Sequence, residues 1–525
     1  MALRLVPALA ASGLEDGESW VAVSPEGEES DAPGRREVGG ELEAAFVAAI
    51  PDLLALCRTL GADPSAVLAH TPSAAANVSD LGLMMAWSRL AEAWASEGRK
   101  TVLVCADPWL YRHLSALPGV VAAPPPPLTG RLSRLRGFAA RLRYGLRAAG
   151  RCLRLPALPR QGGSWLLSYG NPQSGPDGTD AYFGSLMRER TDLCRVLHVD
   201  CPPDEARRLN GDGRSFSLHG WGSAIFAVTR LPFARWRPRA EMMNGPWGWL
   251  VRRAAAHEAA TAQGAAIAWQ IHCQRRWLEA VRPLAVAWPW ENHGWERDLA
   301  RAARRLGVAS AGYQHSSVGR FELNHHVDAN PDGLGSLPDL VLCTGSLTRE
   351  GLTRWGLPEG RSRVAGALRF TPSPGPRWDG EAPVFVALPG DVSMAARMVG
   401  AVARVARRLG RRILIRPHPI YDVPVSEDEW VTRATTGLAG QPAVSAVVYA
   451  ATTVGLESVL FGLPTIRFIA AGCIAHDILP NTVNVPAADE AGLAAAIEAA
   501  APPPAIAREQ VFAPVDHDVW RQALP

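Results

Sequence analysis

Short apolar runs that alternate with helical segments constrain the fold of this chain more than any other feature. The runs are rich in β-branched and aliphatic residues, and several of the segments between them carry apolar residues at helical spacing. Strands that alternate with helices in this way favour parallel α/β sheets. The predicted strands span residues 100–107, 164–170, 284–290, 308–315, 339–344, 363–367, 383–390, 411–417, 443–450 and 464–469.

The strands fall into two series, which are separated by a loop rich in Asn, Asp and Gly at residues 324–338. With 525 residues the chain is too long for one ordinary core. We therefore predict two doubly wound domains that face a central cleft, one over residues 76–335 and one over 336–500. Residues 1–75 are predicted to be a lead-in, acidic and rich in Gly, Ser and Pro at 13–41, and residues 501–525 a tail. Helices are predicted over 41–60, 81–97, 293–306 and 392–409.

Composition argues against several classes of protein. The formal net charge of +3 is small for this length, so we expect no nucleic-acid partner. The eight cysteines include no C-x-x-C pair, which argues against a zinc ribbon or a disulfide framework and fits a reducing compartment.

Arg4 is the only positive charge near the N-terminus, so we do not expect a signal peptide, and no apolar run approaches the ~18 residues that span a bilayer. We expect a cytoplasmic location.

Residues 130–155 form a basic insert after a polyproline stretch. The insert has no acidic residue, and its leucines and arginines lie on different faces of a predicted helix. Such a helix can lie on the anionic inner face of the cell membrane, or it can pack as an ordinary helix on its leucine face, and both readings stay open. The leucine face comprises Leu132, Leu135, Ala139, Leu142, Leu146 and Leu153, and the arginines are Arg136, Arg143, Arg147, Arg151 and Arg154.

Polar residues stand at the ends of many predicted strands, which is where ligands bind in open parallel α/β sheets. In the second series Gly390 ends the run 383–390, and Thr452 and Thr453 begin a helix that contains Glu457. A helix start attracts anions, and a carboxylate one turn later can accept sugar hydroxyls. The plain structural alternative is a capped helix with Glu457 near the dipole.

The motif RPHP follows the strand 411–417. Each proline favours extended geometry for the residue before it, so Arg416 and His418 project to the same side if the strand pleat continues. A guanidinium and an imidazole suit a diphosphate, and the imidazole can also protonate a leaving phosphate. The alternative is a solvated surface corner. We favour phosphate binding because the Thr-Thr helix start follows a neighbouring strand.

The first series supplies candidates for proton transfer. Glu291 lies just past the strand 284–290, and His315 ends the strand 308–315. Either side chain could deprotonate an acceptor hydroxyl if its pKa and geometry fit. The alternative for Glu291 is a helix-capping role. Glu296 and Arg297 lie inside the next predicted helix, and for Glu296 a structural ion pair is favoured.

These motifs together resemble a known group. RPHP, followed by a strand, the Thr-Thr pair and GLES-LFG-P-I, is similar to the C-terminal half of GT-B glycosyltransferases of bacterial surface-polysaccharide assembly. Similar pairs occur in HP-motif sialyltransferases, capsule 3-deoxy-manno-octulosonate transferases and CDP-glycerol glycerophosphotransferases. The stretches WENHGWER (290–297) and GYQHSS (312–317), with DAYFGSL (180–186), resemble a family of capsule and O-antigen biosynthesis proteins. The resemblance covers roughly residues 95–490.

The resemblance implies a GT-B fold and sugar transfer from a nucleotide-sugar, with a CMP-linked sugar as one candidate donor, without a metal or other cofactor. It implies that Arg416 and His418 hold the donor phosphate and that Thr452 and Thr453 hold the nucleotide. The sialyltransferase base motif is not carried over, because Pro331 stands at its first position. The implied acceptor is a growing or lipid-linked glycan.

Three alternatives stay open from the sequence. The same fold could transfer glycerol phosphate or ribitol phosphate from a CDP-linked donor, or it could epimerise a sugar nucleotide without any acceptor. A protein of polysaccharide assembly with a decayed site is the third possibility.

Overall fold

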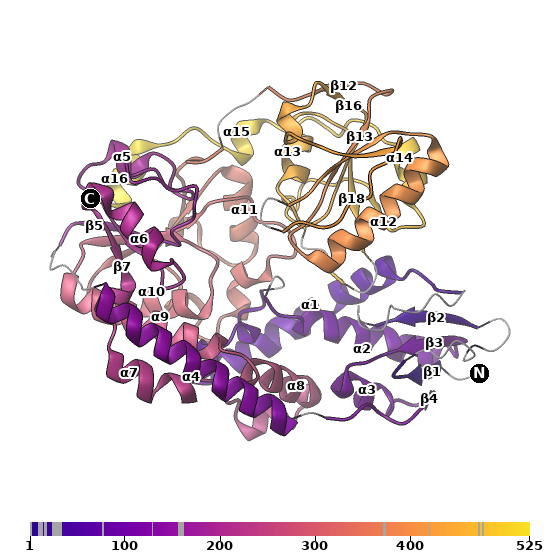
Figure 1. Ribbon diagram of the computed structural model, residues 1–525, viewed down its shortest axis with the longest axis horizontal. Coiled ribbons are helices and arrows are strands. Elements are labelled where there is room, and N and C mark those ends of the chain that lie inside the picture. The colour runs from indigo at the N-terminus through magenta and orange to yellow at the C-terminus, as the bar shows by residue number, and fades with distance from the viewer. Residues whose placement is uncertain are drawn as a thin grey trace.

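Three parallel sheets organise the chain in the computed structural model (Figure 1). We call them the N-terminal, central and C-terminal sheets. A separate two-stranded pair joins β12 (Arg377–Trp378) and β16 (Ala443–Val444). The structure describes residues 3–8, 14, 18–23, 34–75, 78–128, 130–155, 162–370, 374–418, 421–470, 473–474 and 477–525.

The central sheet has seven strands in the order β11-β10-β9-β8-β5-β6-β7. Counted from β5, this is the doubly wound order, and the order reverses between β5 and β8. The strands are β5 (Ser164–Ser168), β6 (Cys194–Leu197), β7 (Ser215–Ser217), β8 (Ala285–Pro289), β9 (Ala309–Gln314), β10 (Leu340–Cys343) and β11 (Ser362–Val364). The helices of this region are α4 (Gly130–Arg154), α5 (Leu186–Glu189), α6 (Pro203–Leu209), α7 (Ala224–Thr229), α8 (Gly248–Ala259), α9 (Gln263–Val281), α10 (Gly294–Arg305) and α11 (Ser346–Arg354).

The C-terminal sheet repeats the doubly wound order with six strands, β15-β14-β13-β17-β18-β19. Helix α12 (Val392–Leu409) buries one apolar stripe on it, begins at the cap of Asp391 and ends at Gly410, which has φ 61°. Further helices are α13 (Val454–Leu460) and α14 (Leu493–Glu498). The strands are β13 (Val384–Ala387), β14 (Ile413–Arg416), β15 (Val431–Arg433), β17 (Val447–Tyr449), β18 (Thr465–Phe468) and β19 (Ala487–Ala488).

Two Rossmann-like sheets in one chain are what the predicted fold requires, and this prediction is confirmed. The division between them differs from the sequence-based boundary. β10 pairs with β9, and β11 pairs with β10, so the central sheet continues past residue 335 to Val364. Buried parallel strands are all continuous apolar runs, so their sequences do not say in which sheet they pair.

The N-terminal sheet was not predicted. The run 100–107 contains β3 (Thr101–Val104), which we expected in the same sheet as 164–170 but which pairs with β1 (Leu3–Val6) and β2 (Ser19–Ala22). β4 (Val120–Ala122) completes the sheet, and α1 (Gly39–Gly61), α2 (Leu81–Ser96) and α3 (Pro108–Leu114) accompany it. The predicted lead-in therefore carries two strands, which are too short to show periodicity; residues 24–33 of the acidic stretch lie outside the described residues.

The C-terminal tail returns to the central sheet through α15 (Arg508–Val511) and α16 (His517–Ala523) (Figure 1). Trp520 is buried there, and its Nε1 donates to the Ala365 carbonyl at 3.1 Å. The returning chain runs beside the outgoing one, because Ala367 N donates to Ala513 O at 2.9 Å. The tail is thus part of the core of the central sheet.

Helix α1 is long and apolar enough to cross a membrane by length and composition, and it is the one described helix that passes this test. Its apolar residues Leu42, Phe46, Leu53 and Leu60 are buried in the core that it shares with α2. We therefore describe α1 as a core helix.

Helix α4 confirms the predicted helix, and of the two readings that the sequence left open it argues against packing on the leucine face. Leu132, Leu135, Leu146 and Leu153 are 56–76% exposed, so the leucine face is not the packed face. The helix packs instead through small residues on α7 and α8: a Cβ on Gly137 would lie 1.9 Å from Ala259 O. Contact through glycine allows close backbone approach and leaves the leucines outside, which helical spacing alone could not reveal.

Candidate functional site

The two doubly wound sheets each have a point where the strand order reverses, and ligands bind beyond the carboxyl ends of the strands at such a point. In the central sheet the reversal lies between β5 and β8, and the loops that follow carry Tyr169 and Glu291. In the C-terminal sheet it lies between β13 and β17, and the loops carry Gly390 and Thr452. The topology thus places predicted site residues at both reversal points.

Backbone strain marks both loops. Asn292 has φ 56° and Ala451 has φ 46°, and both adopt the left-handed conformation without being glycine. Such strain persists where the surrounding structure imposes it, and it concentrates at functional sites. The other two positive-φ non-glycine residues among the described residues are Ala74 and Arg282.

Glu291 and His293 form a hydrogen-bonded pair at the end of β8. His293 Nε2 lies 3.0 Å from Glu291 Oε2, and Nδ1 of the same ring has no hydrogen-bond partner among the described residues. Burial raises the pKa of Glu291, but the hydrogen bond and charge of His293 outweigh it and lower the pKa to about 2. Burial lowers the pKa of His293, and its bond to Glu291 more than compensates, so that this pKa is raised. His293 is thus an imidazole oriented by a carboxylate, an arrangement that can accept a proton, and the side chain of Glu291 is 34% exposed.

More imidazoles surround this pair. The His315 ring lies 5.0 Å from the Tyr182 ring, and burial together with Arg369 lowers the pKa of His315 to about 4. The His70 ring lies 5.1 Å from that of His293, and burial lowers the pKa of His70 to about 4. Both are therefore neutral near pH 7 and can accept a proton or a hydrogen bond. The structure thus places Glu291 and His315, the two candidate bases, in one region together with His70 and His293, and their catalytic role stays a prediction.

Buried polar atoms without partners concentrate in this region. An unsatisfied buried polar atom costs about 1–3 kcal/mol, so such a concentration indicates a site for a polar ligand or water. The atoms are His70 Nδ1, His198 Nε2, His293 Nδ1, Glu296 Oε1, Gln314 Oε1, His315 Nδ1, His325 Nδ1 and Asn330 Nδ2. We call this group, with Glu291 and Tyr182, the histidine site.

Glu296 holds the loop that presents the pair. Its Oε2 accepts from Glu291 N and Asn292 N, both at 2.9 Å, and from Trp288 Nε1 at 3.0 Å. Burial raises the pKa of Glu296 to about 7. The ion pair with an arginine that was favoured from the sequence is not found among the described residues, because Oε2 of Glu296 is occupied by two backbone amides and an indole.

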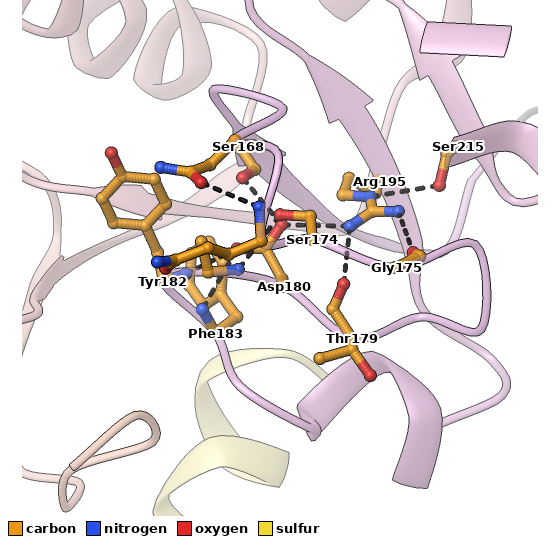
Figure 2. Close-up of polar contacts among 12 residues, drawn as sticks. Ser168, Ser174, Gly175, Thr179, Asp180, Tyr182, Phe183, Arg195 and Ser215 are labelled. Carbon is orange, nitrogen blue, oxygen red and sulfur yellow. Dashed lines mark hydrogen bonds and ion pairs between the residues drawn. The ribbon is translucent and has the colours of Figure 1, made fainter. Parts of the chain in front are cut away.

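A buried ion pair supports the segment that carries Tyr182, which lies beside His315 in the histidine site (Figure 2). Arg195 Nη1 lies 3.1 Å from Asp180 Oδ2, and both side chains are fully buried. Asp180 Oδ1 accepts from the backbone N of Tyr182 at 2.8 Å and of Phe183 at 3.2 Å. Arg195 also donates to the carbonyls of Gly175 and Thr179 and to Ser215 Oγ. The first residue of DAYFGSL therefore positions Tyr182 against His315, a role that the sequence did not indicate.

On the C-terminal sheet, Arg416 and His418 lie at the end of β14. Arg416 Nη1 donates to Ala434 O at 3.2 Å and Thr435 O at 3.3 Å, which follow β15. His418 lies on the other side, where a Cβ on Gly390 would be 3.6 Å from its ring. Burial lowers the pKa of His418. The two side chains thus reach toward different neighbouring strands, and their joint action on one phosphate stays a prediction; Pro419 lies outside the described residues.

Thr452, Thr453 and Glu457 follow β17, next to the Gly390 loop. The pairing of Ala387 with Arg416 and with Tyr449 brings the three loops to one edge of the sheet. Thr453 is the N-cap of α13, a helix of seven residues, and makes no side-chain cap hydrogen bond. Burial raises the pKa of Glu457, and Arg508 opposes that shift. Nucleotide binding by this group also stays a prediction.

A cavity of about 670 Å³ lies between helices α1, α2 and α8 on one side and the start of α12 on the other, and neither Glu291 nor Arg416 lines it. His70 of the histidine site lines it on one side, and Asp391, which follows Gly390, lines it on the other. Its apolar lining includes Phe46, Leu53, Leu81, Leu83, Met394 and Ile474. Among the described residues, no group of three or more His, Cys, Asp or Glu side chains is arranged to hold a metal ion.

No protein-family model matches the chain, and a search of curated proteins finds no significant match. Among solved structures, the glycotransferase of kitacinnamycin is 14% identical over 65% of this chain and 90% of that chain, with a TM-score of 0.39. The UDP-GlcNAc 2-epimerase of Methanocaldococcus jannaschii, in complex with UDP-GlcNAc and UDP, is 11% identical over 64% and 91%, with a TM-score of 0.36. The calicheamicin glycosyltransferase CalG4 is 12% identical over 64% and 89%, with a TM-score of 0.38. Such values assign neither an activity nor a residue, so the activity must be inferred from the site.

Proposed function

We propose that the protein is a glycosyltransferase of surface-polysaccharide assembly that transfers a sugar from a nucleotide-sugar to a glycan or lipid-linked acceptor. The observation that carries the proposal is the placement of two chemically different groups at the reversal points of two doubly wound sheets. One group holds a carboxylate–imidazole pair, and the other presents Arg416, His418 and the Gly390 and Thr452 loops.

The nucleotide-sugar binds at the C-terminal sheet. Its phosphates lie against Arg416 and His418, and its nucleotide occupies the loops of Gly390 and Thr452–Thr453, with Glu457 on the sugar hydroxyls. Arg416 Nε and Nη2 have no partner among the described residues, so they are available to a phosphate. His418 stabilises or protonates the departing phosphate. No metal takes part in this transfer.

The acceptor hydroxyl is deprotonated at the histidine site. The imidazole of His293, kept basic by Glu291, takes the proton, and the neutral imidazole of His315 holds the hydroxyl. Deprotonation there and charge stabilisation at Arg416 require the two substrates to meet between the sheets. The cavity of about 670 Å³ supports this arrangement, because it is lined by His70, whose ring lies 5.1 Å from that of His293, and by Asp391, which follows Gly390. Its apolar side suits the hydrophobic part of an amphipathic acceptor.

The proposal is tested by calorimetric titration of the purified protein with CMP, CDP, UDP and GDP, followed by assays of nucleotide release with and without acceptor-bearing membranes. Binding of one nucleotide and acceptor-dependent release are expected, with no loss of activity in EDTA. If no nucleotide binds, the donor site is wrong. Release of a modified sugar nucleotide without acceptor would instead identify an epimerase, and incorporation of glycerol phosphate would identify a phosphotransferase.

Helix α4 and its neighbours dock the enzyme on an anionic bilayer. Leu132 and Leu135 on α4 and Ile225 on α7 are 68–77% exposed. Phe138 on α4 lies 5.6 Å from Phe233, which is 60% exposed. Arg136, Arg143, Arg147 and Arg154 are exposed beside them, and residues 130–155 include no acidic side chain. Exposed apolar side chains among uncompensated arginines are typical of helices that lie in the interface of anionic membranes.

Flotation with vesicles tests the membrane surface. Wild-type protein is expected to float with phosphatidylglycerol vesicles more than with phosphatidylcholine vesicles, and Leu132→Ser with Leu135→Ser is expected to reduce flotation at least tenfold. Leu284→Ser, at a site 60% exposed outside this surface, is the control. Equal flotation of all variants would contradict the proposal, and a monomer–dimer shift confined to the α4 variant would show that a second copy occupies the surface instead.

A further inference from the structure

A second polar cavity, of about 440 Å³, lies along helix α10 and is distinct from the cavity of about 670 Å³. Arg297, Arg301 and Arg305 line it from one helix face, since they are spaced four residues apart, and Arg275 joins them from α9. The rest of the wall comes from α10 itself, from the end of α1 and from two loops, namely Gly294, Asp298, Gly61, Ala62, Asp63, Pro64, Ala66, Val67, Ala69, Pro72, Ser73, Pro331 and Asp332. We call this cavity the arginine pocket.

The carboxylates of the arginine pocket are already paired. Asp298 bonds Arg275, and Asp332 bonds Arg301 at 2.9 Å. Asp63 accepts from Ser65 N at 2.7 Å and lies 3.8 Å from Arg239. Two of the four arginines, Arg297 and Arg305, are therefore left without a carboxylate partner among the described residues.

Arg297 is the more unusual of these two. Its side chain is buried, with 5% exposure, and burial lowers its pKa to about 10, so it is still charged at neutral pH. Its Nε donates to Asn292 Oδ1 at 3.4 Å, and its Nη2 has no hydrogen-bond partner among the described residues. A buried guanidinium with unmet donors is costly unless an anion completes them.

We propose that the arginine pocket binds a phosphate group, held by Arg297 from within and by Arg305 at the mouth. Arg297 and Arg305 lie about two turns apart on the same face of α10, and phosphate is the anion class that matches two guanidinium forks, because each fork can bind two of its oxygens. The site is separate from the proposed donor site and does not depend on it. Binding there would also fix Asn292, the strained residue that separates Glu291 from His293.

Calorimetric titration with inorganic pyrophosphate tests the pocket. All variants carry Arg416→Ala, so that the proposed donor site does not contribute. We expect one binding event whose affinity falls with added salt, and Arg305→Gln is expected to weaken it about tenfold because one charge-assisted contact is lost. Arg305 is exposed, so we expect Arg305→Gln to fold normally. Arg297→Gln is expected to abolish binding, and its titration is interpreted only if its circular dichroism spectrum is native.

Arg412→Gln is the matched control, because Arg412 is exposed on the C-terminal domain and lines neither cavity. Competition by short-chain phosphatidic acid would identify a lipid phosphate as the natural source, and competition only by soluble phosphate esters would identify a free metabolite; either outcome supports the pocket. No pyrophosphate binding in the Arg416→Ala parent, or binding that Arg305→Gln and Arg412→Gln leave equally unchanged, would overturn it.

Discussion

The two points where the strand order reverses share the same sheet topology, but their side chains differ in burial and in internal hydrogen bonding. At the central sheet, the Glu291–His293 pair is held by Glu296, walled by Tyr182, and surrounded by buried imidazoles whose pKa values are shifted. At the C-terminal sheet, Arg416 makes two long bonds to carbonyls, and Thr453 makes no cap bond. The first is organised without a ligand, and the second leaves its donors available for one.

The difference follows from what each site is proposed to handle. A base needs a fixed position and a tuned pKa, and burial supplies both. A charged donor brings its own phosphates, so its site needs exposed cations that a ligand can organise. Changes at the central sheet should therefore affect turnover and stability, and changes at the C-terminal sheet should affect binding.

The largest expected effect comes from Glu291→Gln, which tests whether changes at the central sheet affect turnover rather than binding. Loss of the charge that keeps His293 basic is expected to reduce kcat by about 10²–10⁴-fold and to leave nucleotide affinity unchanged. Because the pKa of His293 falls without Glu291, the residual activity should rise at lower pH than in the wild type. Nucleotide release with acceptor-bearing membranes, measured from pH 5 to 9, checks both points.

Glu279→Gln is the matched control for that change, since Glu279 is exposed on α9. Equal turnover of the two variants, or an unshifted pH profile for Glu291→Gln, would remove Glu291 from the proposed base.

Asp180→Asn removes the buried ion pair with Arg195 that supports the histidine site. It leaves Arg195 charged and buried without its partner, so the unfolding free energy should fall by about 3–5 kcal/mol. Urea denaturation followed by tryptophan fluorescence measures the change. Asp204→Asn breaks an exposed pair in the same region and should cost at most about 1 kcal/mol. A similar loss in both variants would mean that the buried pair does not organise this wall.

Arg416→Ala and His418→Ala probe the C-terminal sheet. Each is expected to weaken nucleotide binding by roughly 10–100-fold through loss of charge-assisted hydrogen bonds, with little change in Tm. Calorimetry and thermal unfolding of the same samples separate the two effects, and Arg412→Ala serves as the exposed control. Destabilisation without loss of binding would make the motif a structural corner.

The smallest expected effect is the pH dependence of Glu296. Its folded pKa of about 7 lies above the ordinary value of 4.5, so its contribution to stability is complete below pH 4.5 and is lost as the pH rises through 7. Glu296→Gln keeps the uncharged form at every pH. The Tm of the variant relative to wild type should therefore increase by roughly a few degrees between pH 5 and pH 8. A difference that is constant across that range would contradict the raised pKa.

Sequence patterns predicted the doubly wound sheets and the strand ends that carry Glu291, His315, Gly390 and Thr452, because buried strands and their polar ends are local features. They did not predict the N-terminal sheet, since β1 and β2 are four residues each and pair across some eighty residues or more.

The sequence also concealed which residues support the site. Asp180 and Arg195 are an ordinary charged pair in the sequence, and only folding makes them a buried one. His293 was visible beside Glu291, but its role depends on a side-chain distance of 3.0 Å that no spacing rule gives. The face by which α4 packs stayed open for the same reason, since glycine contacts carry no hydrophobic signal.

The returning C-terminal tail has a mechanical consequence. The chain leaves the central sheet after Val364 and comes back at Ala513, and a hydrogen bond from Ala367 to Ala513 joins the two crossings. Two adjacent tethers act as a hinge, because they permit rotation about one line and resist twisting about others. We expect the C-terminal domain to rotate about this line for nucleotide exchange and to return to the same position. The second of the two chain crossings is anchored by the buried Trp520, five residues from the end of the chain.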